Sequence, residues 1–227
     1  MNHPAFDSPF PSGVAFAWSG SLPPAPSLLP EEAALLPPES VDSRSGDFAL
    51  GRACAHAALV TLGAETRSAP RPILRDGSRM PRWPEGIRGS ITHTHGIAAA
   101  AVAWERDFPM IGLDLEDWRR GSSRLGKRIL RPEERAAVFA LPEAEQGRAI
   151  ATIFAAKESI YKALNPLTGI YLGFQDGLIT DLDLPLGEAG GFRWQLTRPC
   201  GSRFAEGFGG TGQFRVSGHF VLAGLWA

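Results

Sequence analysis

Residues 90–118 read SITHTHGIAAAAVAWERDFPMIGLDLEDW. Within this stretch, two β-type runs, SITHTHG and IAAAAVAW, are separated at Gly96, which predicts a β-hairpin. After a turn at residues 107–109, the run MIGLDLEDW alternates apolar and acidic residues, a pattern typical of a strand. The middle of the chain is therefore expected to form a hairpin followed by a further strand.

Helical patterns lie on either side of these strands. Upstream, the run FALGRACAHAALVTL follows Asp47, a residue suited to cap a helix, and stops at Gly63. Downstream, we expect one helix to begin at Pro132 and a long one to extend from about Glu145 to Leu164. The sequence therefore predicts helices both before and after the central strands.

The remaining segments complete a mixed fold. A strand is expected at Val14–Trp18, a short helix at Glu31–Leu36, and Pro166 just past the end of the long helix. The C-terminal runs GLITDLDL, FRWQLTR and GQFRVSGHFVLAGLWA predict strands and a last hairpin. Because a helix followed by a hairpin recurs, the expected fold class is α+β, with two similar halves at residues 1–108 and 109–227.

Composition and charge describe an ordinary globular protein. Of 227 residues, 44% are hydrophobic and 21% are charged, which allows a real core. The formal net charge of −1 creates no field that favours nucleic acid or an anionic membrane. Basic residues nevertheless cluster at residues 67–88 and 119–131. These segments either face a polyanionic ligand or an acidic partner, or are solvated loops.

Three observations favour a cytoplasmic protein. Cys54 and Cys200 are far apart and have no metal-ligand spacing, as expected in a reducing compartment. The N-terminus lacks a basic start followed by an apolar run. No apolar stretch is long enough to span a bilayer.

Two carboxylates in the third strand are candidate metal ligands. Asp114 and Glu116 are two positions apart, so their side chains project from the same face of a strand. Like charges held this close repel unless a proton or a cation intervenes, and oxygen ligands suit Mg²⁺. The alternative is an ordinary polar strand face.

The long helix carries the second group of candidates. Lys157 falls on the apolar stripe of that helix, so its ammonium either reaches the edge or faces a cleft that holds an anion. Glu158 and Lys162 are separated by one helical turn on an adjoining face. Taken alone, this second pair is equally typical of a surface ion pair.

Taken together, the segments resemble the phosphopantetheinyl transferase superfamily. The similarity is carried by PRWPEGIRGSITHT, IGLDLED, FAAKESIYKAL and the upstream GRACAHAAL, in the expected order, and covers about residues 44–173. The resemblance is in particular to the single-chain class that acts on nonribosomal peptide, polyketide and siderophore synthetases, including the enterobactin-synthetase component D type. The resemblance implies two pseudo-symmetric α/β halves with the active site in the cleft between them.

The resemblance also implies roles for individual residues. The Mg²⁺ ligands would be Asp114, Glu116 and Glu158. The coenzyme A contacts would be Arg44, Arg52, Arg75, Thr92, His93, Asp114, Lys157, Glu158 and Lys162, with Arg44 and Arg52 on the 3′-phosphate and Lys157 and Lys162 near the diphosphate. Arg79 and Arg82 are alternatives to Arg75 in the same loop. The catalytic group would be Glu158, Lys162 and Asp114, with Glu158 as the base, directly or through a metal-bound water.

The implied reaction moves the phosphopantetheine arm of coenzyme A to a serine of an apo acyl or peptidyl carrier protein and releases 3′,5′-ADP. The expected partners are coenzyme A and carrier domains, without nucleic acid or membrane, and the expected state is a monomer because both halves lie in one chain. Two other hypotheses stay open. One is a Mg²⁺-dependent phosphatase, and the other is a non-catalytic coenzyme A or carrier-binding module.

Overall fold

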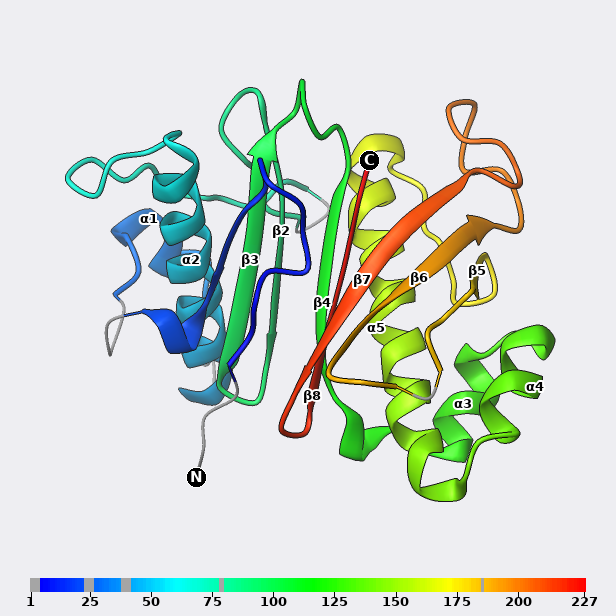
Figure 1. Cartoon of the computed structure of the whole chain (residues 1–227). Helices are drawn as coiled ribbons and strands as arrows, with labels where there is room; N and C mark the ends of the chain where they lie inside the picture. Colours follow the sequence, from blue (N-terminus) through cyan, green and yellow to red (C-terminus); the bar gives the residue numbers. More distant parts are fainter. Residues whose placement is uncertain (1–4, 23–26, 38–41, 78–79, 185) are drawn as a thin grey trace. The chain divides into compact units, whose positions relative to one another are not determined.

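The structure is a computed structural model, and it describes residues 5–22, 27–37, 42–77, 80–184 and 186–227, except for the side chains of residues 42–44 (Figure 1). The chain divides into two compact units. The N-terminal unit is Pro11–Ile111. The C-terminal unit is Gly112–Ala227 together with the segment that ends at Phe10. Each unit combines helices with an antiparallel sheet, so the expected α+β class is confirmed.

The N-terminal unit is a three-stranded sheet with one long helix packed against it (Figure 1). The strand order is β1-β3-β2, and all neighbours are antiparallel. The elements are β1 (Ala15–Trp18), the 3₁₀ turn η1 (Ser19–Ser21), α1 (Pro30–Ala33), α2 (Asp42–Leu62), β2 (Ile87–Thr94) and β3 (Ile97–Trp104). The predicted strand at residues 14–18, the short helix and the hairpin are all present.

The hairpin between β2 and β3 has the geometry that its sequence predicts. His95 and Gly96 connect the strands, and both have positive φ, 48° and 76°. Two successive residues with positive φ match the twist of the flanking strands, and glycine adopts this conformation at little cost. The register then places Thr94 opposite Ile97.

Helix α2 begins earlier than predicted, and Asp47 is not its N-cap. The helix begins at Asp42 and ends at Leu62, before Gly63 with φ 78°. Asp47 lies inside the helix, and its Oδ1 accepts the N–H of Gly96 at 2.9 Å. The Asp47 carboxylate therefore does not cap its own helix but accepts a hydrogen bond from the β2–β3 hairpin, 49 residues away in sequence.

Small side chains line the contact between α2 and β3 in the core of the N-terminal unit. Cys54, Ala55 and Ala58 of α2 are fully buried against Ala98 and Ala100 of β3. Small residues let the helix axis approach the sheet closely. Consequently the polar residues of α2 lie near those of β2.

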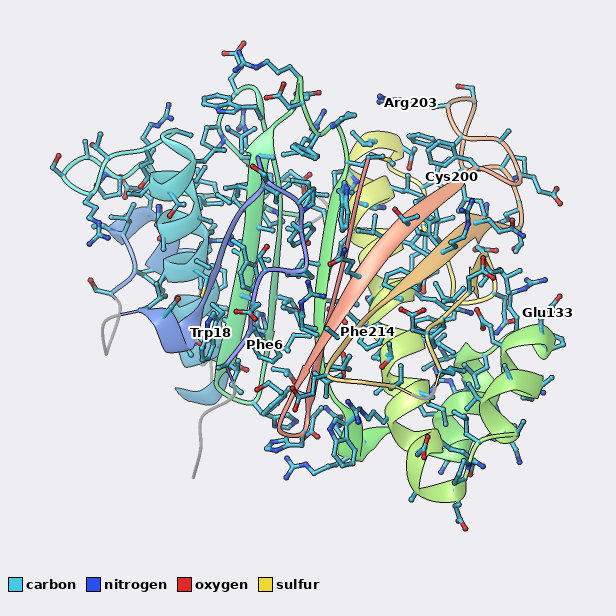
Figure 2. The ribbon with its side chains drawn as sticks, in the orientation of Figure 1. Phe6, Trp18, Glu133, Cys200, Arg203 and Phe214 are labelled. Atoms are coloured by element: carbon cyan, nitrogen blue, oxygen red, sulfur yellow. The ribbon has the colours of Figure 1, made fainter. Side chains whose placement is uncertain are left out.

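The C-terminal unit contains a five-stranded sheet in the order β4-β8-β7-β6-β5, in which β5 to β8 pair antiparallel. Its strands are β4 (Ile111–Asp117), β5 (Gly177–Thr180), β6 (Ala189–Leu196), β7 (Gly209–Ser217) and β8 (Phe220–Trp226). Its helices are η2 (Trp118–Arg120), α3 (Ser123–Ile129), α4 (Pro132–Phe139) and α5 (Glu143–Thr168). Helix α5 packs against β8, and Phe214 of β7, labelled in Figure 2, is fully buried.

Two helices differ from expectation. Helix α3 occupies a segment expected to be a loop; Ser122 Oγ caps it by accepting the N–H of Leu125 at 3.2 Å. Helix α5 includes Pro166 and ends at Gly169, which has φ 67°. A proline in the last turn removes one backbone donor, and the Gly169 N–H still closes the helix on Asn165 O at 2.8 Å.

Residues 5–10 belong to the C-terminal unit, although residues 1–108 were expected to form one half. The Phe10 ring lies 5.8 Å from the Trp226 ring, centroid to centroid. The Ala5 N–H donates to Ser217 Oγ at 2.9 Å. These aromatic and hydrogen-bond contacts, with partners more than 200 residues away in sequence, attach the segment to β7 and β8. No described helix is long and apolar enough to cross a membrane.

Candidate active site

A glycine brings helix α5 close to strand β4. A Cβ added to Gly112 would lie 1.9 Å from the backbone oxygen of Ser159, so no larger residue fits without moving the helix. Ser159 follows Glu158 and precedes Lys162 by three positions. The close approach at Gly112 therefore brings the polar residues of α5 beside the carboxylates of β4.

Lys162 and Asp114 form the central ion pair of this region. The Lys162 ammonium donates to Asp114 Oδ1 at 2.6 Å and to the Leu113 carbonyl at 3.1 Å. The Asp114 residue is 5% exposed, and the Lys162 side chain is 22% exposed. A charge-assisted bond at this length is strong, so the pair holds α5 to β4 while leaving the ammonium reachable from solvent.

The other two carboxylates lie in an environment that disfavours their charge. Burial raises the pKa of Glu116 to about 8; the negative charges of Asp114 and Glu158 add to this shift, and Lys162 and Arg120 oppose it. Burial, and then Asp114, also raises the pKa of Glu158. The charges of the three predicted metal ligands therefore act on one another, and we call these three residues the carboxylate cluster.

The chemistry of this cluster fits a hard divalent cation. Three carboxylates supply oxygen ligands, and a bound cation would offset the repulsion that raises their pKa values. Within the described residues, no group of three or more His, Cys, Asp or Glu side chains is arranged to hold a metal ion. The ligand set of Asp114, Glu116 and Glu158 therefore stays a prediction.

Lys157 is placed differently from the expectation that it lies near a diphosphate. Its ammonium is buried and donates to Glu134 Oε2 at 2.7 Å, and to the carbonyls of Ile129 and Phe174 at 2.8 Å each. These three acceptors use all three N–H groups of an ammonium. Lys157 therefore fixes α5 to α4 and to the ends of α3 and the loop after α5, inside the C-terminal unit.

Two predicted phosphate ligands converge on one aromatic ring in the N-terminal unit. The guanidinium carbons of Arg52 and Arg75 lie 4.6 and 4.7 Å from the centroid of the Phe48 ring. Burial lowers the pKa of Arg52 to about 10; Glu32 opposes this, and the nearby positive charge of Arg75 adds to it. Two like charges held close together favour an anionic ligand.

His93 faces helix α2, whereas Thr92 lies on the opposite face of β2. Gly51 lets α2 approach β2, because a Cβ there would be 3.0 Å from Ile91 Cγ2 and 3.8 Å from His93 Cδ2. His93 Nδ1 is 3.8 Å from Asp47 Oδ2, and its side chain is 46% exposed. Thr92 is buried and alternates to the opposite face of β2.

Some predicted residues cannot be placed, and others were missed. The side chain of Arg44 and the whole of Arg79 lie outside the described residues. Arg82 is described and exposed. Glu134 and Phe48 were not predicted as site residues. Glu134 lies in the PEE run at the start of the expected helix. No sequence pattern pairs it with Lys157, which is 23 residues away.

Comparisons with known proteins agree with the motifs. Residues 31–103 match the 4′-phosphopantetheinyl transferase N-terminal domain, and residues 110–204 match the 4′-phosphopantetheinyl transferase superfamily. Together these segments contain every predicted site residue.

Curated relatives extend the agreement over most of the chain. The 4′-phosphopantetheinyl transferase Svp of Streptomyces mobaraensis is 37% identical over 81% of this chain and 72% of its own length. The 4′-phosphopantetheinyl transferase PptT of Mycobacterium tuberculosis is 38% identical over 74% of this chain and 71% of its own length. Enterobactin synthase component D of Salmonella typhimurium is 31% identical over 61% of this chain and 56% of its own.

Among solved structures, holo-[acyl-carrier-protein] synthase of Thermotoga maritima covers 52% of this chain and 62% of its own, with a TM-score of 0.38 and 21% identity, too distant for comparison of residues. The assignment rests instead on the two family matches and the two transferases that span more than two thirds of their own length. The chain therefore belongs to the 4′-phosphopantetheinyl transferase superfamily.

Proposed function

We propose that this transferase is Mg²⁺-dependent and that Asp114, Glu116 and Glu158 hold the metal ion. The observation that carries the proposal is that Lys162 of α5 donates to Asp114 of β4 at 2.6 Å, with Glu116 and Glu158 near enough for their charges to interact with both residues. A bound Mg²⁺ would supply Lewis-acid stabilisation of the diphosphate of coenzyme A. In this proposal the chain supplies the ligands, and the close packing at Gly112 sets the distance between α5 and β4.

Lys162 is proposed to stabilise the departing 3′,5′-ADP. Its ammonium is partly exposed and already paired with Asp114, so it is held in place before a substrate arrives. A preorganised cation beside a leaving group lowers the barrier because it needs little rearrangement in the transition state.

Glu158 is proposed to accept the proton of the attacking serine hydroxyl, directly or through water. It is half-buried, lies one turn before Lys162 on α5, and interacts with Asp114. In this proposal the hydroxyl oxygen forms the new bond to phosphorus, the bond from phosphorus to the 3′,5′-ADP oxygen breaks, and the serine proton passes to Glu158.

The N-terminal unit is proposed to bind phosphates of coenzyme A through Arg52, Arg75 and His93, with Arg44 and Thr92 retained as predicted contacts. Support comes from Arg52 and Arg75, which both lie against Phe48. A guanidinium suits this task because its fork of donors matches phosphate oxygens. Lys157 is left out of this set because Glu134, Ile129 and Phe174 already accept from its ammonium.

The acceptor is proposed to be an apo peptidyl or acyl carrier protein, and the enzyme is proposed to be a cytoplasmic monomer. Free, buried thiols at Cys54 and Cys200 support a reducing compartment. The presence of the carboxylate cluster and the arginine pair in one chain supports the monomer. A sedimentation measurement that gives an obligate oligomer would contradict it.

The decisive experiment follows the intact mass of an apo peptidyl carrier domain, and then of an apo acyl carrier protein, with coenzyme A and Mg²⁺. We expect each accepted carrier to gain one phosphopantetheine. Chelation with EDTA should abolish the gain, and added Mg²⁺ should restore it. Glu158→Gln should also abolish it, whereas the matched control Glu143→Gln, an exposed position on the same helix, should retain it.

Two outcomes would favour the other hypotheses. If coenzyme A binds but every carrier stays apo, the chain is a binding module. If inorganic phosphate is released steadily from simple esters in the presence of Mg²⁺, the carboxylates serve a phosphatase. Transfer that persists unchanged in EDTA would contradict the metal proposal alone.

A further inference from the structure

A buried chain of ionisable residues lies behind Arg52 in the N-terminal unit. His56 of α2 contacts Glu32 of α1 through Nε2, at 2.9 Å from Oε1, and Glu65 through Nδ1, at 2.8 Å from Oε1. Both carboxylate side chains are 1% exposed, and the imidazole is 18% exposed. A ring that contacts a carboxylate at each nitrogen can donate at both only as imidazolium, and these contacts raise the pKa of His56 against the effect of burial.

Glu32 is fixed on several sides. Its Oε1 also accepts the N–H of Ile73 at 2.9 Å, and its Oε2 accepts the N–H of Leu29 at 3.3 Å. The contacts with His56 and with these backbone groups lower the pKa of Glu32, although burial opposes them. Glu32 is therefore a buried anion with a defined position.

The same carboxylate faces Arg52. Arg52 Nε lies 4.0 Å from Glu32 Oε1, and the Arg52 side chain is 5% exposed. Within the described residues, Nε is buried and has no hydrogen-bond partner. The position of the guanidinium therefore depends on the charge of Glu32 and on the Phe48 ring, and not on a hydrogen bond at Nε.

We propose that Glu32, fixed by His56 and Glu65, is a positioning residue that holds Arg52 in the orientation that binds the 3′-phosphate of coenzyme A. This inference rests on the proposed coenzyme A site. Without the Glu32 charge, repulsion between Arg52 and Arg75 would move the Arg52 guanidinium away from its place over Phe48. The 3′-phosphate would then lose a preoriented partner, while the metal and the carboxylates of the C-terminal unit would be unaffected.

The test compares coenzyme A with 3′-dephospho-coenzyme A as phosphopantetheine donors, with kcat and KM measured for each. For Glu32→Gln we expect KM for coenzyme A to rise by about tenfold, while KM for the dephospho donor and both kcat values change by less than about twofold. Glu31→Gln, the same substitution at an exposed neighbour on α1, is the matched control and should leave all four constants unchanged. Glu32→Asp, which keeps the charge, should recover part of the preference for coenzyme A.

A purely structural role predicts a different pattern. Glu32→Gln would then lower the thermal midpoint but would leave the ratio of the two KM values as in the wild type, and this result would overturn the inference. If Glu32→Gln fails to fold, the same kinetic comparison is made with Glu65→Gln. This substitution keeps Glu32 and weakens only the contact between Glu65 and His56. The preference for coenzyme A is the KM for the dephospho donor divided by the KM for coenzyme A. A fall in this ratio of threefold or more, about 0.65 kcal/mol, supports a positioning role for Glu32, and an unchanged ratio contradicts it. A wild-type protein that uses neither donor would instead refute the proposed function.

Discussion

Lys162 Nζ lies 2.6 Å from Asp114 Oδ1, and this contact joins helix α5 to strand β4. Glu158 and Glu116 lie close enough to interact electrostatically with both residues. One lysine therefore lies among three carboxyl groups, two of which have a raised pKa. A divalent cation would favour their charged forms and offset the repulsion between them.

Replacement of Lys162 by alanine is expected to lower kcat for carrier modification by about 10²–10³-fold. The reason is that the substitution removes a preorganised cation from the proposed leaving-group site. Intact-mass time courses measure the rate. Lys127→Ala, an exposed lysine on α3, is the control. A Lys162→Ala rate within twofold of the wild type would exclude Lys162 from catalysis.

Lys157→Met is expected to destabilise the protein by about 3–5 kcal/mol, because it leaves the buried Glu134 carboxylate without its cation. Urea unfolding monitored by far-UV circular dichroism measures the change. The double variant Lys157→Met with Glu134→Gln should recover part of the loss, since it removes the uncompensated charge. A variant with wild-type stability and a raised KM for coenzyme A would instead place Lys157 at the ligand.

Gly112→Ala is expected to destabilise the C-terminal unit by about 1–3 kcal/mol or more, because the added Cβ would lie 1.9 Å from Ser159 O. The shift of α5 should also reduce transfer activity. Gly46→Ala is the matched control, since a Cβ at that helical position meets nothing within 4 Å. Equal unfolding midpoints for the two variants would show that α5 can move without cost.

The Glu32–His56–Glu65 cluster predicts a pH-dependent stability. The folded pKa of His56 is raised, so its stabilising contribution is complete below its ordinary pKa of about 6.5 and is lost as pH rises through the folded pKa. The folded pKa of Glu32 is lowered, so its contribution is present above its ordinary value and is lost as pH falls through the folded pKa.

Thermal midpoints of the wild type and of His56→Gln, measured from pH 5 to pH 9, check this prediction. The advantage of the wild type should be largest near pH 5–6 and should shrink as pH rises. The charged groups near His56 are Glu32 and Glu65, with Arg52 beyond Glu32. A difference that is constant with pH would mean that His56 does not change its charge in this range.

Local patterns predicted much of the fold and one part of the site. The β2–β3 hairpin follows from two β-type runs and a glycine at the turn, and α4 begins at Pro132 as expected. The GLDLE and KES motifs placed Asp114, Glu158 and Lys162 correctly on a strand and a helix. These inferences succeed because side-chain period and turn chemistry act over a few residues.

Other elements could not be predicted because their determinants are distant. Asp47 had the residue type of a helix cap, yet its carboxylate accepts from Gly96, 49 residues away. Helix α3 lies in a segment rich in charged residues, where its packing against α5 outweighs a weak local signal.

The sequence by itself determined the family, the α+β class and the residue types available for metal and phosphate binding. Only the tertiary structure decided which charges pair. In the structure Lys157 pairs with Glu134, Lys162 pairs with Asp114, and Arg52 lies beside Glu32. A buried charge must find a partner in space, and packing selects that partner without regard to separation along the chain.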